Sequence, residues 1–202
     1  MIEKGNLLVI SGPSGAGKGT LCRVLVEKDP AIKLSVSATT RPPRGDERDG
    51  LHYHFLTRAV FQRMIEAGDL LEWAEVYSNY YGTPRRLVYD VLEQGRDVIL
   101  EIDIQGALQV KEKIRSAVLI FIAPPSLGEL RRRLTARGTD APEEIARRLS
   151  FTLAEMKLAS RYDYIVLNDE VGPAVAKLQS IVRAEKCRPR FFEGYLAQFS
   201  SS

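Results

Sequence analysis

The chain has 202 residues, of which 45% are hydrophobic and 27% charged, and this length suffices to bury a full core as one compact domain. The formal net charge is only +3, which gives little support to a nucleic-acid partner. Cys22 and Cys187 are the only cysteines and form no Cys/His cluster, so we expect no structural zinc and a reduced, cytoplasmic location. No apolar run approaches the roughly 20 residues of a membrane span, and the first residues lack a signal-peptide layout, so no membrane association is expected.

A glycine-rich segment near the start matches the G-x-x-x-x-G-K phosphate-loop pattern. It follows the apolar run 7–10, which predicts a buried strand, and precedes residues 21–27, which predict a helix. In this context the glycines let successive N–H groups point at one anion, and Lys18 reaches the outer phosphates. A nucleoside triphosphate is therefore the expected ligand. The residues expected to bind it are Gly12, Pro13, Ser14, Gly15, Ala16, Gly17, Lys18, Gly19 and Thr20.

One position of the loop departs from the strict pattern. Gly19 stands where a Ser or Thr that ligates Mg²⁺ usually follows the lysine. Thr20 is the neighbouring hydroxyl. We therefore expect Thr20 to face the metal instead, through water.

Strands and helices alternate along the rest of the chain. The apolar runs 97–102, 117–122 and 164–167 predict strands covered on both faces of a parallel sheet. Thr83-Pro84 is typical of a helix N-cap followed by proline, with Gly95 as the terminator. Residues 126–129 match a capping box that opens a further helix. This alternation predicts a doubly wound α/β fold whose ligand lies at the carboxyl ends of the strands.

Two stretches interrupt the alternation. Residues 35–96 hold a polar, arginine-bearing segment, a helix near 57–67 and a strand at 70–74, and an insertion of this size usually carries function. Residues 128–158 hold several arginines around the turn 138–142, which predicts a mobile helical lid. Arg131, Arg132 and Arg133 point in successive helix directions, so we expect Arg131 and Arg132 to be solvated. The chain is thus expected to be a single domain, with a core of residues 1–34, 97–127 and 159–202, an insertion 35–96 and a lid 128–158.

Several motifs, in one order, resemble the guanylate kinase family of nucleoside monophosphate kinases. They are the loop from Gly12, the string from Ser37 to Phe55, residues 79–83, residues 103–106, Arg137-Gly138 and Asn168-Asp169. The resemblance covers essentially the whole chain. It implies ATP-dependent, Mg²⁺-assisted phosphorylation of GMP to GDP, with two small-molecule substrates and neither nucleic acid nor membrane as a partner.

The resemblance also implies which residues bind GMP. Arg41 and Arg44, with the hydroxyls of Tyr53 and Tyr81, would hold its phosphate, a task that suits guanidinium groups because they bind phosphates bidentately. The N1–H and N2–H₂ donors of guanine call for a carboxylate. That role falls to Glu72, with hydroxyls from Ser37 and Thr83.

The remaining roles implied by the resemblance concern catalysis and ATP. Lys18 and Arg41 act on the phosphates together with the lid arginines Arg133, Arg137 and Arg148. Glu47 orients an arginine, and Asn168 lies near the ATP base. Asp103 lies near the base and, with Thr20, is a candidate metal-facing residue. No general base is needed, because the attacking phosphate oxygen is already anionic near neutral pH.

Three other functions are alternatives to the activity that this resemblance implies. A kinase for AMP or another monophosphate shares the G-K-G-T ending of the loop, but it gives no reason for Glu72 with Ser37 and Thr83. A non-catalytic protein-binding module on the same scaffold does not need the retained Lys18 and Arg41. A regulatory GTPase is disfavoured because Asn168-Asp169 lacks the base-reading N-K-x-D pattern.

Overall fold

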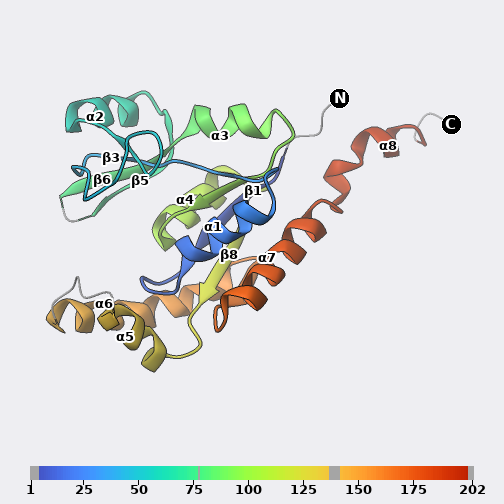
Figure 1. Cartoon of the computed structure of the whole chain (residues 1–202). Helices are drawn as coiled ribbons and strands as arrows, with labels where there is room; N and C mark the ends of the chain where they lie inside the picture. The colour runs from blue at the N-terminus through green and yellow to red at the C-terminus, as the bar shows by residue number, and fades with distance from the viewer. Residues whose placement is uncertain (1–4, 77, 137–141, 200–202) are drawn as a thin grey trace.

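The computed structural model describes residues 5–76, 78–136 and 142–199 (Figure 1). Within them a five-stranded parallel sheet, in the order β2-β7-β1-β8-β9, forms the centre of the molecule. Its strands are β1 (Leu7–Ser11), β2 (Lys33–Leu34), β7 (Val98–Glu101), β8 (Val118–Ala123) and β9 (Tyr164–Leu167). The prediction of an α/β fold with a central parallel sheet is confirmed.

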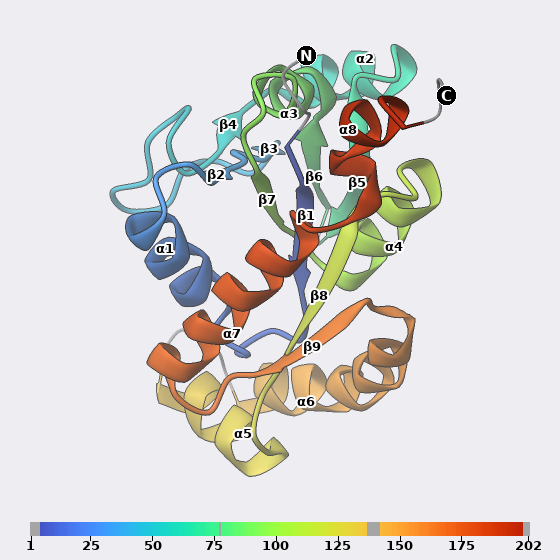
Figure 2. The same ribbon diagram turned by 90° about the vertical axis from the view of Figure 1, so that its right-hand side faces the viewer.

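Helices cover both faces of the central sheet. Successive side chains of β1 point to opposite faces, so alternate residues of this strand pack against different helices. Leu8 and Ile10 pack against α1 (Lys18–Lys28) and α7 (Val171–Glu185). Leu7 and Val9 pack against α3 (Arg85–Leu92) and α4 (Ile104–Lys113). Figure 2 shows α1 and α7 on one side of the strands and α4 on the other.

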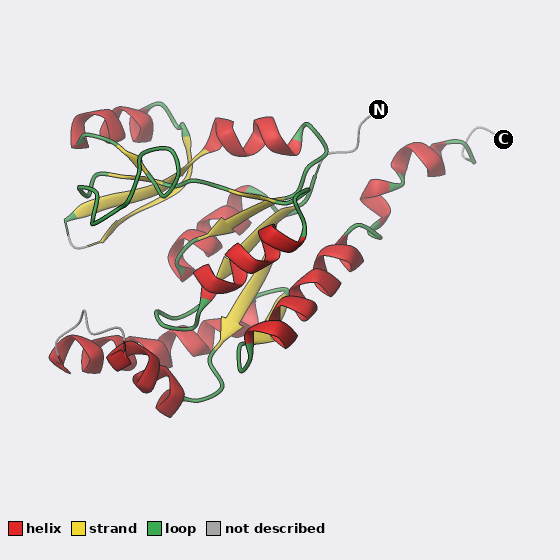
Figure 3. Ribbon diagram, in the orientation of Figure 1, coloured by secondary structure: helices red, strands yellow, loops and turns green. Residues whose placement is uncertain are grey.

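A second, smaller sheet lies within residues 35–96 and is set apart from the central sheet (Figure 3). Its strand order is β4-β3-β6-β5, formed by β3 (Ala38–Thr39), β4 (His54–Phe55), β5 (Leu70–Val76) and β6 (Asn79–Pro84). Helix α2 (Arg58–Glu66) buries Phe61 against Ala38 and Leu70 of this sheet. Helix α3 belongs to the same stretch of chain, yet its Val88 and Leu92 pack on the central sheet.

Two helices, α5 (Leu127–Ala136) and α6 (Pro142–Lys157), lie at the opposite end of the molecule from the second sheet (Figures 1 and 2). The expected cap is present, since Glu129 N donates to Ser126 Oγ at 3.0 Å. The Glu129 carboxylate instead pairs with Arg132 and Arg133. Short helical turns at Leu158–Arg161 and Pro189–Phe191 and the helix α8 (Glu193–Ala197) complete the elements.

Two sequence expectations about these elements were wrong. Thr83 does not cap α3, because it belongs to β6 and its hydroxyl donates to Glu72 Oε1 at 2.7 Å. Strand β9 is not covered on both faces, because it is the edge of the sheet and leaves Ile165 58% and Leu167 45% exposed. The terminator of α3 is confirmed: Gly95 has φ 76° and donates to Leu92 O. No helix within residues 5–76, 78–136 and 142–199 combines the length and apolar character needed to cross a bilayer.

Candidate active site

The glycine-rich loop joins the end of β1 to the start of α1 and depends on left-handed glycines. Gly12, Gly15 and Gly17 have φ of 142°, 88° and 89°. A Cβ on Gly12 would collide with the carbonyl oxygen of Ile122 in β8. A Cβ on Gly17, the N-cap of α1, would collide with the side-chain amide of Asn168. The backbone of the loop therefore approaches its neighbours more closely than any side chain would permit.

Lys18 begins α1 and turns back over the loop. Its Nζ donates to Gly12 O at 2.6 Å and to Pro13 O at 3.1 Å. Burial lowers the pKa of Lys18, and the carboxylates of Glu101 and Glu155 oppose that shift. The loop pocket that this lysine borders is lined by Ser14, Gly15, Gly17, Lys18, Gly19, Thr20 and Glu101. The six loop residues that line it are thus accompanied by a single acid, Glu101, whose role the sequence did not indicate.

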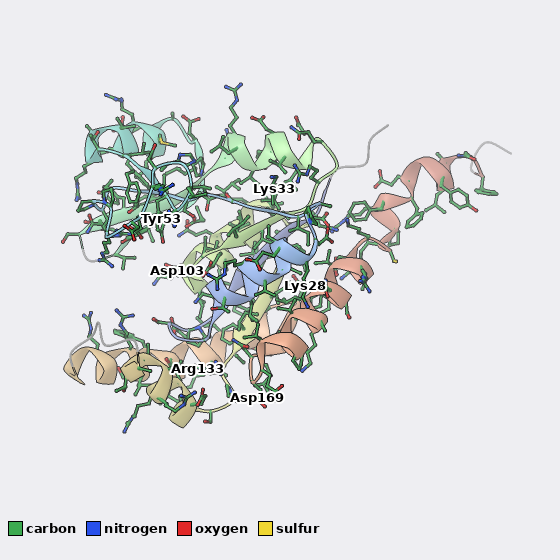
Figure 4. All side chains as sticks on the ribbon, viewed as in Figure 1. Lys28, Lys33, Tyr53, Asp103, Arg133 and Asp169 are labelled. Atoms are coloured by element: carbon green, nitrogen blue, oxygen red, sulfur yellow. The ribbon has the colours of Figure 1, made fainter. Side chains whose placement is uncertain are left out.

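A second cavity, the sheet pocket, lies between the second sheet and the carboxyl ends of the central strands. It is lined by Lys18, Ser37, Tyr53, Glu72, Ala74, Val76, Tyr81, Gly82, Glu101, Ile102 and Asp103. Lys18 therefore faces both this pocket and the loop pocket. In Figure 4 Tyr53 lies with the second sheet and Asp103 lies between that sheet and the lower helices.

Glu72 is the buried acid of the sheet pocket, with 5% of its surface exposed. The hydroxyl of the fully buried Thr83 donates to its Oε1. Burial raises the pKa of Glu72 to about 7, against the hydrogen bond from Thr83. A Cβ on Gly106 would lie 2.7 Å from Glu72 Oε2, so the first turn of α4 makes room for the carboxylate. Asp103 caps that helix by accepting from Gly106 N at 2.7 Å.

Arg41 is held beside the sheet pocket by a two-pronged ion pair. Its Nη1 and Nη2 lie 2.8 and 2.9 Å from the carboxylate oxygens of Glu47, which also accepts from Arg44 N at 2.8 Å. The hydrogen bonds from Arg41 hold the pKa of Glu47 at about 2. The Arg41 guanidinium lies 5.3 Å from the ring centroid of Tyr53, whose edge contacts Tyr81. The side chain of Arg44 is exposed.

A third cavity, the lid pocket, lies between the loop and α5. It is lined by Gly15, Gly17, Thr20, Glu129, Arg132, Arg133, Ala136, Asn168, Asp169 and Val171. Asn168 ties the loop to the turn after β9 by donating from Nδ2 to Ala16 O at 2.7 Å. Arg133 donates to Glu129 Oε1 at 2.7 Å and to Asn168 O at 3.1 Å. Figure 4 shows Arg133 and Asp169 near one another in the lower part of the molecule.

The two predicted lid arginines that the structure describes, Arg133 and Arg148, do not meet at one point. Arg148 of α6 contacts the loop, where its Nη1 donates to Ser14 Oγ at 2.9 Å. Arg133 lines the lid pocket and not the loop pocket. Arg137 lies outside the described residues. Of the two described, Arg148 is therefore the lid arginine that contacts the glycine-rich loop.

Sequence reasoning assigned no role in a site to four charged residues that line these pockets. Glu101 was taken only as part of an apolar strand, although an acid at the carboxyl end of a buried strand is a recognisable signal. Glu129 was identified only as part of a helix cap, and Asp169 only as part of a motif. Arg132 is exposed as expected, but it also lines the rim of the lid pocket beside Glu129.

The doubly wound parallel sheet with a glycine-rich loop between β1 and α1 defines the class: a phosphate-loop nucleotide-binding protein. Comparison with known proteins narrows it further. The family model described as guanylate kinase matches residues 4–185. The chain belongs to the guanylate kinase family.

Similar proteins cover nearly the full length of the chain. It is 55% identical over 186 residues to a guanylate kinase of Caldanaerobacter subterraneus subsp. tengcongensis, covering 92% of this chain and 90% of that one. It is also 55% identical over 194 residues to a guanylate kinase of Desulfitobacterium hafniense, covering 94% of this chain and 97% of that one. The crystal structure of guanylate kinase from Anaplasma phagocytophilum superimposes with a TM-score of 0.77 at 35% identity, covering 93% of this chain and 89% of that one.

Proposed function

We propose that the protein transfers the terminal phosphoryl group of ATP to GMP, forming ADP and GDP. The observation that carries this proposal is the presence of two pockets that share Lys18. One is formed by the glycine-rich loop, and the other is lined by Glu72, which accepts a hydrogen bond from the buried Thr83. Family membership supports the same activity.

The sheet pocket is the proposed GMP site. The ionised carboxylate of Glu72 accepts hydrogen bonds from N1–H and N2–H₂ of guanine, and Ser37 and Thr83 supply hydroxyls beside it. Adenine lacks this pair of donors, so it would leave a desolvated carboxylate unpaired, at a cost of about 1–3 kcal/mol or more for each misplaced group. Arg41, positioned by Glu47, binds the GMP phosphate with Arg44, Tyr53 and Tyr81.

The loop pocket and the lid pocket form the proposed ATP site. The loop amides and Lys18 bind the phosphates, while Asn168 lies beside the base in the lid pocket. Lys18, Arg41 and Arg148, together with Arg133 and Arg137, stabilise the negative charge that spreads over the phosphoryl group during in-line transfer. The acceptor oxygen is already anionic, so positioning and charge neutralisation suffice without a general base.

A magnesium ion fits this site as part of the proposal. The described residues contain no group of three acidic, His or Cys side chains that would hold a metal by themselves. Mg²⁺ commonly binds through one or two protein oxygens plus substrate phosphates, which agrees with Thr20 at the loop pocket and Asp103 at the sheet pocket. When bound, the ion would neutralise phosphate charge. Thr20 and Asp103 would orient its water ligands.

Two further parts of the proposal concern movement and location. Residues 35–96 and 128–158 would act as the GMP-binding insertion and the lid, closing over the substrates and excluding water. A cytoplasmic location fits the two free cysteines, Cys22 and Cys187.

A coupled assay of ADP formation on ATP, run with GMP, AMP and other monophosphates in turn, tests the proposal. GMP should be phosphorylated far faster than AMP. Glu72→Ala should impair the use of GMP much more than the affinity for ATP, because Glu72 lies only in the sheet pocket. Equal activity with AMP would favour a kinase for another monophosphate, and no transfer at all would favour a binding module.

A further inference from the structure

Strand β5 carries Glu72 at an irregular point of the second sheet. The register of its pairing with β6 shifts between Leu70 and Trp73, so Leu71 and Glu72 lie in a bulge-like irregularity, called here the β5 bulge. An irregularity of this kind bends a strand locally and re-aims the side chains on it. One of the re-aimed side chains is the carboxylate that lines the sheet pocket. The direction of Glu72 therefore depends on what holds the β5 bulge in place.

The outer edge of β5 is bonded to helix α4. Strand β5 ends the order β4-β3-β6-β5, so the N–H and C=O groups on that edge need partners other than a strand of this sheet. Trp73 N donates to Gln109 Oε1 at 3.4 Å, and Gln109 Nε2 donates to Trp73 O at 3.2 Å. Lys113 Nζ donates to Leu71 O at 2.7 Å. The backbone on both sides of Glu72 is thus hydrogen-bonded to α4, which lies beside β5 in Figure 2.

The positions of α4 that meet the β5 bulge lie on one face of the helix. Gly106, Gln109 and Lys113 are spaced i, i+3 and i+7, which places them along one side. Gln109 and Lys113 bond the backbone on either side of Glu72. Gly106 leaves room for the carboxylate, since a Cβ there would lie 2.7 Å from Glu72 Oε2. One helix face therefore contacts three successive residues of β5.

Helix α4 is itself fixed to the central sheet. Ala107 and Val110 are fully buried in the same core cluster as Val9 of β1. A side chain held by a packed element keeps its geometry better than one held by a loop. The carboxamide of Gln109 offers both a donor and an acceptor, as a neighbouring strand would, and so matches both backbone groups of Trp73. The contacts from α4 thus relate the β5 bulge to the central sheet.

The charges around Glu72 agree with this arrangement. Burial raises the pKa of Glu72 to about 7 and the charge of Asp103 acts in the same direction, whereas the positive charge of Lys113 opposes both. Lys113 therefore favours the ionised carboxylate that guanine requires. The same ammonium group holds the backbone at Leu71.

We propose that Gln109 and Lys113 are positioning residues for the guanine base: they hold the β5 bulge against α4 so that Glu72 points at the pairing edge of the base. Neither of the two side chains lines the sheet pocket, so both act through Glu72. This inference rests on the proposed kinase function and names residues that determine the base specificity of that same site.

Gln109→Ala tests the inference by removing both hydrogen bonds to Trp73. KM for GMP should rise about 3- to 10-fold, while KM for ATP stays unchanged. Lys113→Met should raise KM for GMP in the same way, and Lys113→Arg should restore it, because arginine keeps the donor and the charge. Lys177→Met is the matched control and should change neither KM, since Lys177 is an exposed lysine of α7 on the other face of the central sheet. An unchanged KM for GMP in Gln109→Ala, or a matching rise in KM for ATP, would overturn the inference.

A double-mutant cycle with Glu72→Gln shows whether Gln109 acts through Glu72. Residues that act together are not additive, so in the Glu72→Gln background Gln109→Ala should raise KM for GMP by less than about twofold. A rise of the same size in both backgrounds would contradict the inference, because Gln109 would then act independently of the carboxylate.

The choice of base provides a second readout. IMP lacks the 2-amino group of GMP, so the preference for GMP over IMP in kcat/KM depends on a correctly aimed carboxylate. This preference should fall in Gln109→Ala, and an unchanged preference would overturn the inference. If Gln109→Ala does not fold, as judged by circular dichroism, Gln109→Met keeps the side-chain length without the carboxamide and should give the same results. Failure of the kinase function is recognised separately, since the unaltered protein would then form no GDP from ATP and GMP.

Discussion

At Glu72, burial favours the protonated carboxyl, whereas the proposed recognition of guanine requires the ionised carboxylate. Burial raises the pKa of this carboxyl to about 7, so near neutral pH Glu72 is a mixture of the protonated and ionised forms. Guanine presents donors and therefore needs the ionised form. GMP binding should accordingly release a proton from the fraction of molecules in which Glu72 is protonated.

This titration predicts a pH-dependent affinity for GMP. Affinity should rise as the pH increases through about 7 and fall at lower pH, by up to about tenfold for each pH unit. Isothermal titration calorimetry across that range measures the slope. Glu72→Gln is the control, since it retains only the pH dependence of the GMP phosphate itself. Identical slopes for the two proteins would rule out Glu72 as the titrating group.

The same shift affects the stability of the ligand-free protein with the opposite sign. The pKa of Glu72 is raised from 4.5 to about 7, so the folded state binds a proton that the unfolded chain releases. The contribution of Glu72 to stability is full below 4.5 and should be lost as the pH rises through 7. Thermal unfolding of the unaltered protein should therefore show a decline over this range that is absent in Glu72→Gln. A decline of equal size in both proteins would contradict this assignment.

Arg41 offers a second residue-scale prediction because it is nearly buried and depends on Glu47. Glu47→Gln removes the charge that orients the guanidinium, so KM for GMP should rise about tenfold while KM for ATP changes little. Steady-state kinetics with each substrate varied in turn measures both constants. Asp46→Asn, at the exposed neighbouring position, is the control and should leave them unchanged. A matching rise in KM for ATP would indicate a general disturbance instead of lost positioning.

The sequence indicated most candidate site residues, but not their contacts. The loop from Gly12 was indicated by its motif and Glu72 by the family resemblance, while the pockets that they line are findings of the structure. The position of Glu101 in the site was missed because in the sequence this residue lies at the end of an apolar run that predicts a strand. Its place in both pockets arises only because β7 and α1 pack side by side on the central sheet.

At the scale of single elements, continuous apolar runs predicted β1, β7 and β8, which are central strands with helices on both faces. The same pattern misled at β9, because apolar content does not distinguish an edge strand from a central one. The prediction of a helix N-cap at Thr83-Pro84 was wrong for a related reason. The local signal of a helix cap was overridden by the partner Glu72, which lies across the β5–β6 hairpin.

The N-cap of helix α2 provides a testable prediction about the stability of a single element. Thr57 is its N-cap and accepts a hydrogen bond from Val60 N at 3.3 Å. Thr57→Ala should lower the free energy of unfolding by about 1 kcal/mol, measured by urea denaturation, whereas Thr57→Ser should be nearly neutral because serine keeps the hydroxyl. An alanine variant as stable as the unaltered protein would show that the second sheet, and not this cap, determines where the helix begins.

At the scale of the whole molecule, the second sheet and the α5–α6 pair lie at opposite ends of the central sheet (Figures 1 and 2). The sheet pocket belongs to one end and the lid pocket to the other. We therefore expect the two ends to approach one another when both proposed substrates are bound.

Small-angle X-ray scattering should therefore show a smaller radius of gyration when GMP and a non-hydrolysable ATP analogue are both bound. Each ligand alone should give a smaller change, because it engages one end only. An unchanged radius with both ligands present would argue against closure of residues 35–96 and 128–158 over the substrates.

The Lys18 side chain contacts the same loop whose phosphate ligand it is proposed to bind. Its ammonium group is tethered to two carbonyls of its own turn, so the loop does not present a bare cation to the surrounding salt. An incoming anion has to replace both tethers before it gains the lysine. A chloride ion offers a single acceptor in place of these two carbonyls, whereas a polyphosphate tail offers many acceptor oxygens at once. The lysine contacts within the loop therefore have to be exchanged for phosphate contacts when a nucleotide binds.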